Sequence, residues 1–93
     1  MNPWESKNGK KAYAIVHSYV PPKGHVRLAN ALSRDAAIRW LWKRGSITLG
    51  HKDIACVSFY SYPKPTLEES GRTLDHALIR LVLAVEKAQT NGK

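Results

Sequence analysis

Residues that could perform catalysis or bind a metal are few in this sequence, and they are widely spaced. The single cysteine, Cys56, lies in an apolar stretch that predicts the middle of a strand, where a small buried side chain is the expected role. The adjacent carboxylates of Glu68 and Glu69 fit the start of a helix. The histidines fall on four different predicted elements with no carboxylate cluster beside them: His17, His25, His51 and His76. We therefore assign no catalytic, metal-binding or cofactor-binding residue and expect that the protein is not an enzyme.

Positive charge is concentrated in the first half of the chain. Between residues 7 and 44 there are nine lysines and arginines and one acid, whereas residues 45–93 hold six basic and five acidic residues. The first segment thus carries as much net charge as the whole chain, which is +8. This asymmetry is typical of a protein with an acidic partner, either a phosphate backbone or an acidic protein surface. A basic surface that serves only solubility is the alternative.

Basic and aromatic side chains together indicate binding to a nucleic acid or to a nucleoprotein complex. Cations neutralise phosphates, and exposed aromatic rings stack on bases, as on the sheet surfaces of RNA-binding domains, although neither RNP motif is present. The residues that we expect to make these contacts are Arg27, Arg34, Arg39, Lys43, Arg44, Trp42, Tyr60 and Tyr62. The alternative is a protein-binding regulatory module that touches no free nucleic acid, in which Trp40 or Trp42 anchors the interface.

A short helix from Ser33 to Arg44 is predicted to position most of these side chains. Ser33 is a suitable N-cap, and Gly45 can adopt the left-handed conformation that ends a helix. Ala37 and Leu41 mark the apolar face of this helix. Trp40 and Trp42 lie about 160° apart on the helical wheel, so they face different surroundings. The sequence does not decide which of the two is exposed.

The rest of the chain predicts a small two-layer α+β domain with the order strand, strand, helix, strand, helix and with the helices on one face of the sheet. Residues 46–53 fit either a loop or an edge strand, and the sequence does not decide between the two. In the third strand, Ala55, Val57 and Phe59 form the more buried face, which leaves tyrosines on the open side. Three strands are predicted: Tyr13–Val20 and His25–Leu32, which a turn at 21–24 joins into a hairpin, and Ile54–Tyr62. The signals for the last helix follow: a capping box at Thr66–Glu69, an N-cap at Thr73 and an apolar stripe that begins at Leu74.

The predicted domain organisation is a flexible basic arm at residues 1–11, one α+β domain at 12–89 and a frayed tail at 90–93. Ile79, Val82 and Leu83 lie off the main apolar stripe of the last helix, and we expect them to form a homodimer interface. The unpaired cysteine and the lack of a signal peptide or a long apolar segment predict a cytoplasmic protein without membrane contact.

The layout from Tyr13 to Tyr62, hairpin then short amphipathic helix then strand, resembles small inhibitors encoded by phages and mobile elements, the anti-CRISPR proteins. The resemblance rests on size and layout, without a diagnostic motif. It implies a phage protein that acts without chemistry, by docking on a CRISPR effector and blocking it. Many such inhibitors are acidic mimics of DNA, and the net charge of +8 departs from that pattern. Contact with guide RNA or with an acidic patch of a Cas subunit fits this chain better.

Overall fold

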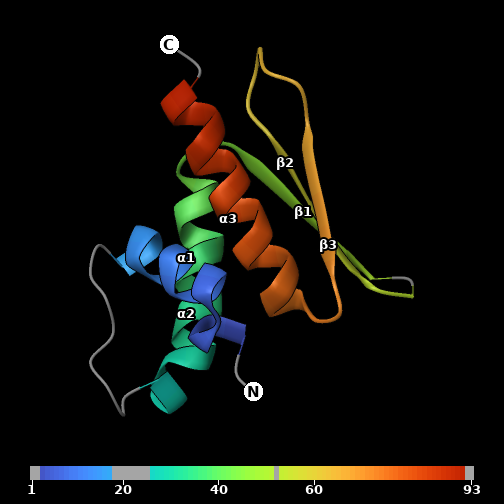
Figure 1. Ribbon diagram of the computed structural model, residues 1–93. Helices are drawn as coiled ribbons and strands as arrows, with labels where there is room; N and C mark the ends of the chain where they lie inside the picture. Colours follow the sequence, from blue (N-terminus) through green and yellow to red (C-terminus); the bar gives the residue numbers. More distant parts are fainter. Residues whose placement is uncertain (1–2, 18–25, 52, 92–93) are drawn as a thin grey trace.

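The computed structural model describes residues 3–17, 26–51 and 53–91. The described residues form a small α+β domain, as predicted, but two helices precede the sheet where two strands were expected (Figure 1). The elements are, in chain order, a 3-10 helix η1 (Pro3–Glu5), α1 (Lys7–His17), α2 (Val26–Trp42), β1 (Ser46–His51), β2 (Ala55–Tyr60), β3 (Leu67–Gly71) and α3 (Leu74–Asn91).

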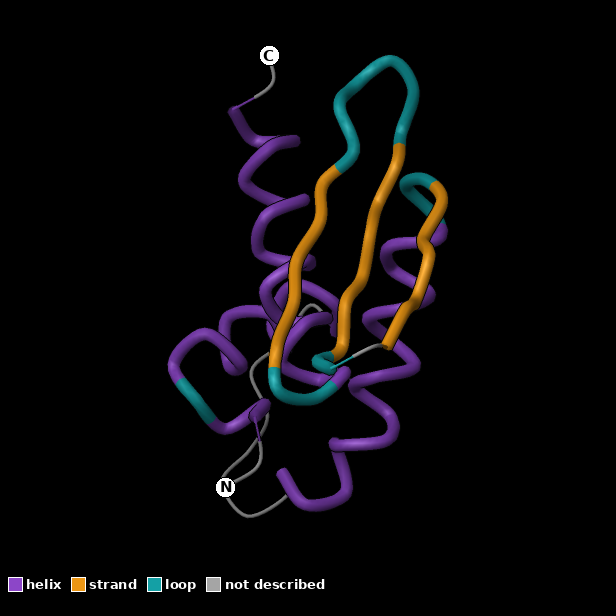
Figure 2. Tube along the Cα trace, turned by 90° about the vertical axis from the view of Figure 1, so that its right-hand side faces the viewer, coloured by secondary structure: helices purple, strands orange, loops and turns teal. Residues whose placement is uncertain are grey.

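The sheet is antiparallel, with β2 between β1 and β3. Residues 46–51, which the sequence left open, therefore form an edge strand. Along β2, Ala55, Val57 and Phe59 are buried against the helices, and Tyr60 is exposed, so the predicted assignment of faces is confirmed. Cys56 belongs to the other face and is half-exposed, which corrects the expectation that it is buried. Figure 2 shows that no helix of the described part of the chain lies on this outer face.

Helices α2 and α3 run parallel and lie on one face of the sheet (Figure 1). α3 packs on β2 and β3, α2 packs on β1, and α1 packs on α2 and α3 rather than on the sheet. The core between these elements is built mainly from aliphatic side chains of β2 and α3, together with Ala37 and Leu41 of α2 and with Trp4. The helices therefore lie on one face of the sheet, as predicted, and α1 covers the side of α2 and α3 that faces away from it.

The expected basic arm at residues 1–11 is structured from Pro3 onward. Ser6 caps α1, because its Oγ accepts the backbone N–H of Gly9 at 2.9 Å. Trp4 is fully buried in the core. Gly9 lies against η1, where a Cβ atom would stand 2.1 Å from the carbonyl oxygen of Pro3, so only glycine permits this approach. The arm is thus an integral part of the domain, and the prediction of flexibility is wrong for these residues.

The hairpin predicted at the start of the domain is also wrong. Residues 13–17 belong to α1 and residues 26–32 to α2, while the turn at 21–24 lies outside the described residues. The alternation of apolar and polar residues after Tyr13 fits a strand, but Gly9, Ala12 and Tyr13 also share one helical face, and this face is the one that is buried. Burial of that face against α2 and α3 outweighs the local β-propensity of the segment.

The structure confirms some of the predicted helix-end signals and contradicts others. Ser33 is not an N-cap, because α2 begins at Val26 and places Ser33 in its buried interior. Gly45 does follow the end of α2, but its φ is outside the left-handed region; a Cβ atom there would stand 2.4 Å from the carbonyl oxygen of Tyr60. Thr66–Glu69 enters β3 instead of capping a helix, since residues 67–71 pair with β2. Thr73 is the predicted N-cap of α3, and its Oγ1 accepts the N–H of His76 at 3.3 Å.

Candidate functional site

A cationic groove lies between α1 and α2. Its cavity measures about 440 Å³, and most of its lining comes from α2 and the turn that follows it, because Ala36, Arg39 and Trp40 lie on one side of α2 and Lys43 continues that spacing just beyond its end. None of the described residues that line it is acidic. They are Ile15 and Val16 of α1 and Ala36, Arg39, Trp40, Lys43 and Arg44. The structure thus brings together three of the five predicted basic contacts in one hollow, which we call the cationic groove.

Arg44 is held in place at the end of this groove. Its guanidinium carbon lies 3.8 Å from the ring centroid of Trp40, and its Nη1 donates to the carbonyl oxygen of Trp40 at 3.0 Å. Its Nε donates to Oε1 of Gln89 in α3 at 3.3 Å. These partners carry no formal charge, so they orient the guanidinium without neutralising it. A fixed cation loses less side-chain entropy when it binds an anion than a mobile one does.

Arg39 and Lys43 extend the positive charge along the exposed side of α2 and the turn that follows it. Nε of Arg39 lies 3.0 Å from Oδ2 of Asp35, one helical turn away, and both side chains are largely exposed. Such a surface pair is worth about 0.3–0.5 kcal/mol, so a phosphate can replace the carboxylate at little cost. Lys43 is exposed. On α1, the exposed Lys11 stands one turn before Ile15, and the sequence prediction did not include it as a contact.

Trp42 is the exposed tryptophan and Trp40 the buried one. The side chain of Trp42 is 66% exposed, whereas Trp40 is 8% exposed beneath the guanidinium of Arg44. Arg39 and Trp42 are three residues apart on α2 and are therefore neighbours on the helix surface. An aromatic ring thus borders the cationic groove, which is the arrangement that the sequence proposed without deciding between the two tryptophans.

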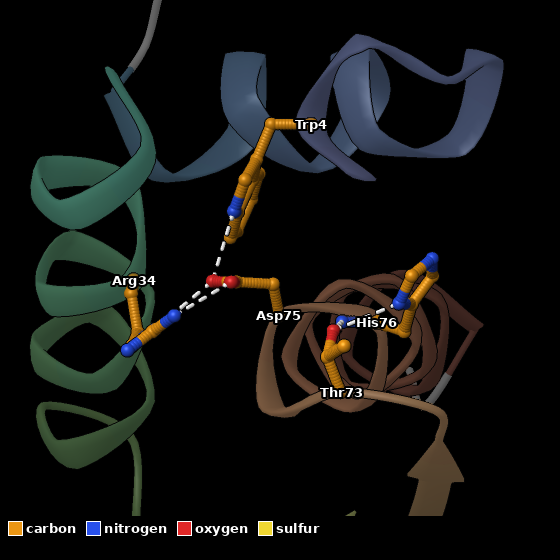
Figure 3. A network of polar contacts seen from close by, with 5 residues as sticks. All are labelled: Trp4, Arg34, Thr73, Asp75 and His76. Atoms are coloured by element: carbon orange, nitrogen blue, oxygen red, sulfur yellow. Dashed lines mark hydrogen bonds and ion pairs between the residues drawn. The ribbon is translucent and has the colours of Figure 1, made fainter. Parts of the chain in front are cut away.

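Arg34 does not belong to the groove, because it is bound to Asp75. Its Nε donates to Oδ1 of Asp75 at 3.1 Å and its Nη2 to Oδ2 at 2.8 Å, while Nε1 of Trp4 donates to the same Oδ1 at 3.2 Å (Figure 3). Burial raises the pKa of Asp75, but the hydrogen bonds and charges of Arg34, Trp4 and His76 outweigh it and leave the pKa below its ordinary value. The bond to Asp75 raises the pKa of Arg34. Arg34 therefore stabilises the fold and is not an open contact.

The remaining predicted contacts are dispersed. Tyr60 is 46% exposed on the outer face of the sheet, and Tyr62 is 83% exposed just after β2. Neither tyrosine is among the described residues that line the groove, although the backbone of Tyr60 lies beside Gly45, the residue after Arg44. Arg27 is in the first turn of α2, and its side chain lies outside the described part of the structure.

The predicted dimer interface is already covered within one chain. Ile79 is 4% exposed and Val82 is fully buried, and both belong to the core; Leu83 is half-buried against it. The sequence indicated that a second apolar patch on this helix needed cover. That cover comes from α1 and α2, because the segment predicted as a hairpin folds into helices that pack on α3. The apolar patch therefore gives no reason to expect a homodimer.

Within the described residues, no group of three His, Cys, Asp or Glu side chains could hold a metal ion. Nδ1 of His76 lies 2.8 Å from Oγ1 of Thr73, and this contact belongs to the cap of α3. In the same part of the chain, no helix combines the length and apolar character needed to cross a bilayer.

Comparison with known proteins gave no relatives: no protein-family model, no curated protein and no solved structure matches this chain.

Proposed function

We propose that this protein is a non-enzymatic cytoplasmic binding protein that holds the phosphate backbone of a nucleic acid, alone or within a nucleoprotein complex, in the cationic groove. The observation that carries the proposal is the convergence of Arg39, Lys43 and Arg44 on a hollow without an acidic lining residue. Phosphates bind such sites because cations release the condensed counterions of the polyanion. Arg44, oriented by Trp40 and Gln89, is the fixed contact, and Arg39 and Lys43 adjust around it.

Trp42 provides a second kind of contact. Its exposed ring stands beside Arg39, so a base attached to a bound phosphate can stack on it. Stacking of this kind is tolerant of sequence, because every base offers a flat face. We therefore expect single strands to bind more tightly than duplexes, in which the bases already stack on one another.

Fluorescence anisotropy with labelled single-stranded RNA, single-stranded DNA and duplex DNA at low salt tests the proposal. The double variant Arg39→Gln/Lys43→Gln should weaken binding at least tenfold. The matched control Arg72→Gln/Lys87→Gln removes the same charge from exposed positions outside the groove and should change affinity much less. Equal losses in the two double variants would assign binding to net charge and not to the groove.

A protein partner is the second candidate function, and the exposure of Trp42 next to arginine favours it, because these residue types often dominate protein interfaces. The anisotropy experiment distinguishes nucleic-acid binding from protein binding. If no nucleic acid binds at low salt but Trp42→Ala abolishes capture of a host protein, the protein-binding function replaces the nucleic-acid one.

The resemblance to anti-CRISPR proteins would narrow the target to a CRISPR effector. It drew on a layout that begins with a hairpin, and the described part of that segment is helical, so it now rests on the helix and strand that follow. A cleavage assay with a purified effector tests this narrower proposal. Full cleavage at a large molar excess of the protein would remove it without affecting the proposed nucleic-acid binding.

A further inference from the structure

A second cavity lies on the sheet side of α3, between the C-terminal half of that helix and the β2–β3 connection. It has a volume of about 190 Å³. Strand residues Phe59 and Leu67 and helix residues Val85 and Ala88 form most of its walls. The described residues that line it are Phe59, Ser61, Lys64, Pro65, Leu67, Val85, Ala88 and Gln89. The cationic groove between α1 and α2 shares none of these residues, so the two hollows are separate.

The polar side chains that line this cavity are those of Ser61, Lys64 and Gln89, and each of them can donate a hydrogen bond. Lys64 is exposed, and the ion pairs found among the described residues, Arg34–Asp75 and Arg39–Asp35, do not involve it. Oε1 of Gln89 accepts a hydrogen bond from Arg44, which leaves the amide nitrogen of Gln89 as a donor. Ser61 adds a hydroxyl. None of the lining residues is acidic, so the cavity combines apolar walls with groups that suit a single negative charge.

We propose that this cavity binds a small organic carboxylate with an apolar body. The apolar body would lie against Phe59, Leu67 and Val85, and the carboxylate would reach the ammonium group of Lys64. Size sets the class of ligand: an apolar cavity of about 150 Å³ accepts benzene, whereas drug-sized ligands need roughly 300–1,000 Å³. A short-chain fatty acid or an aromatic acid of similar bulk therefore fits the measured volume.

Hexanoate and its neutral analogue 1-hexanol are the probes for this proposal. Amide NMR spectra recorded during titration should show saturable shifts at Leu67, Val85 and Ala88 with hexanoate, and weaker binding of hexanol. Lys64→Gln should reduce hexanoate affinity roughly three- to tenfold and leave hexanol affinity unchanged, because the variant removes only the partly screened charge contact. Lys87→Gln removes the same charge from an exposed position of α3 outside the lining, and should change neither affinity.

Ala88→Leu fills the cavity with a residue that favours helices, and should abolish the binding of both probes. Circular dichroism verifies that each variant is folded, and Lys64→Gln keeps the test valid if Ala88→Leu is not. Three results would overturn the proposal: no saturable shift with hexanoate at tens of millimolar, equal affinity for hexanol, or equal effects of Lys64→Gln and Lys87→Gln. A second copy of the chain in the cavity would instead appear as a doubled mass in light scattering, and would also overturn it.

Discussion

Asp75 and Arg34, 41 residues apart, join the first turn of α3 to the middle of α2 through two hydrogen bonds, and Trp4 of η1 adds a third to the same carboxylate. One carboxylate therefore fastens three separate segments of the chain. The side chain of Asp75 is 9% exposed and that of Arg34 is 48% exposed, so solvent screens one partner much more than the other.

Asp75→Asn should lower the free energy of unfolding by about 1–3 kcal/mol. The amide cannot accept all three hydrogen bonds, and the substitution removes the negative charge opposite Arg34. The range allows for solvent screening of the exposed guanidinium. Urea unfolding measures the change. Asp35→Asn is the matched control, since it removes a largely exposed acid from α2, and should alter stability by less than about 0.5 kcal/mol. Equal effects of the two variants would contradict a structural role for the Asp75 network.

Acid should remove the stability that Asp75 contributes. Its pKa in the folded protein lies below the value of 3.8 expected for an unfolded chain. The contribution is therefore fully present above pH 3.8 and is lost as the pH falls through the lower folded pKa. Urea unfolding across pH should show a constant difference between the native protein and Asp75→Asn at pH 5 and above, and a shrinking one below 3.8. A difference already lost at pH 5 would argue against the lowered pKa.

Ser33→Ala distinguishes the sequence-based prediction from the structure by the sign of its effect. The hydroxyl of Ser33 is buried and has no hydrogen-bond partner in the described structure, and the residue lies inside α2. Removing it should raise stability by roughly 0.5–1.5 kcal/mol, because an unsatisfied buried group is lost and alanine favours the helix. An N-cap serine would instead lose about 1 kcal/mol on the same change. Thermal unfolding distinguishes a serine inside the helix from an N-cap serine. Destabilisation by Ser33→Ala would support the N-cap role and contradict the structure.

Trp42 should account for nearly all fluorescence that acrylamide can quench. It is 66% exposed, whereas Trp4 is fully buried and Trp40 is 8% exposed. Trp42→Phe should therefore leave a protein whose remaining emission is shielded and shifted to shorter wavelength. Trp40→Phe is the comparison, and should leave efficient quenching in place. Strong quenching of the Trp42→Phe variant would mean that Trp4 or Trp40 is accessible, which would contradict their burial in the structure.

The sequence predicted the parts of the fold that local patterns determine. The buried alternation of Ala55, Val57 and Phe59 and the cap at Thr73 follow from spacing and turn chemistry over a few residues. The first third of the chain was missed, because its apolar positions fit either a strand or a helix. What selects the helix is contact with α2 and α3, and the position of Trp4 depends on Asp75, 71 residues further along the chain.

The candidate site was predicted in part for the same reason. Arg39 lies in the last turn of α2, and Lys43 and Arg44 follow directly after that helix, so the proximity of the three follows from sequence. Arg34 has the same charge and lies on the same helix, yet its partner is a distant acid that no local pattern reveals. The role of α1 in forming the other wall of the groove could not be predicted, because that segment was assigned to a strand.

The salt dependence of nucleic-acid affinity tests the cationic groove most directly. Each phosphate contact contributes about 0.7–0.9 to the slope of log affinity against log salt concentration. Anisotropy titrations across a salt series should give a steep negative slope for the native protein, and Arg39→Gln/Lys43→Gln should reduce its magnitude by roughly 1.5. The slope of Arg72→Gln/Lys87→Gln should stay close to that of the native protein. A native slope near zero, or the same reduction in both double variants, would contradict phosphate binding in the groove.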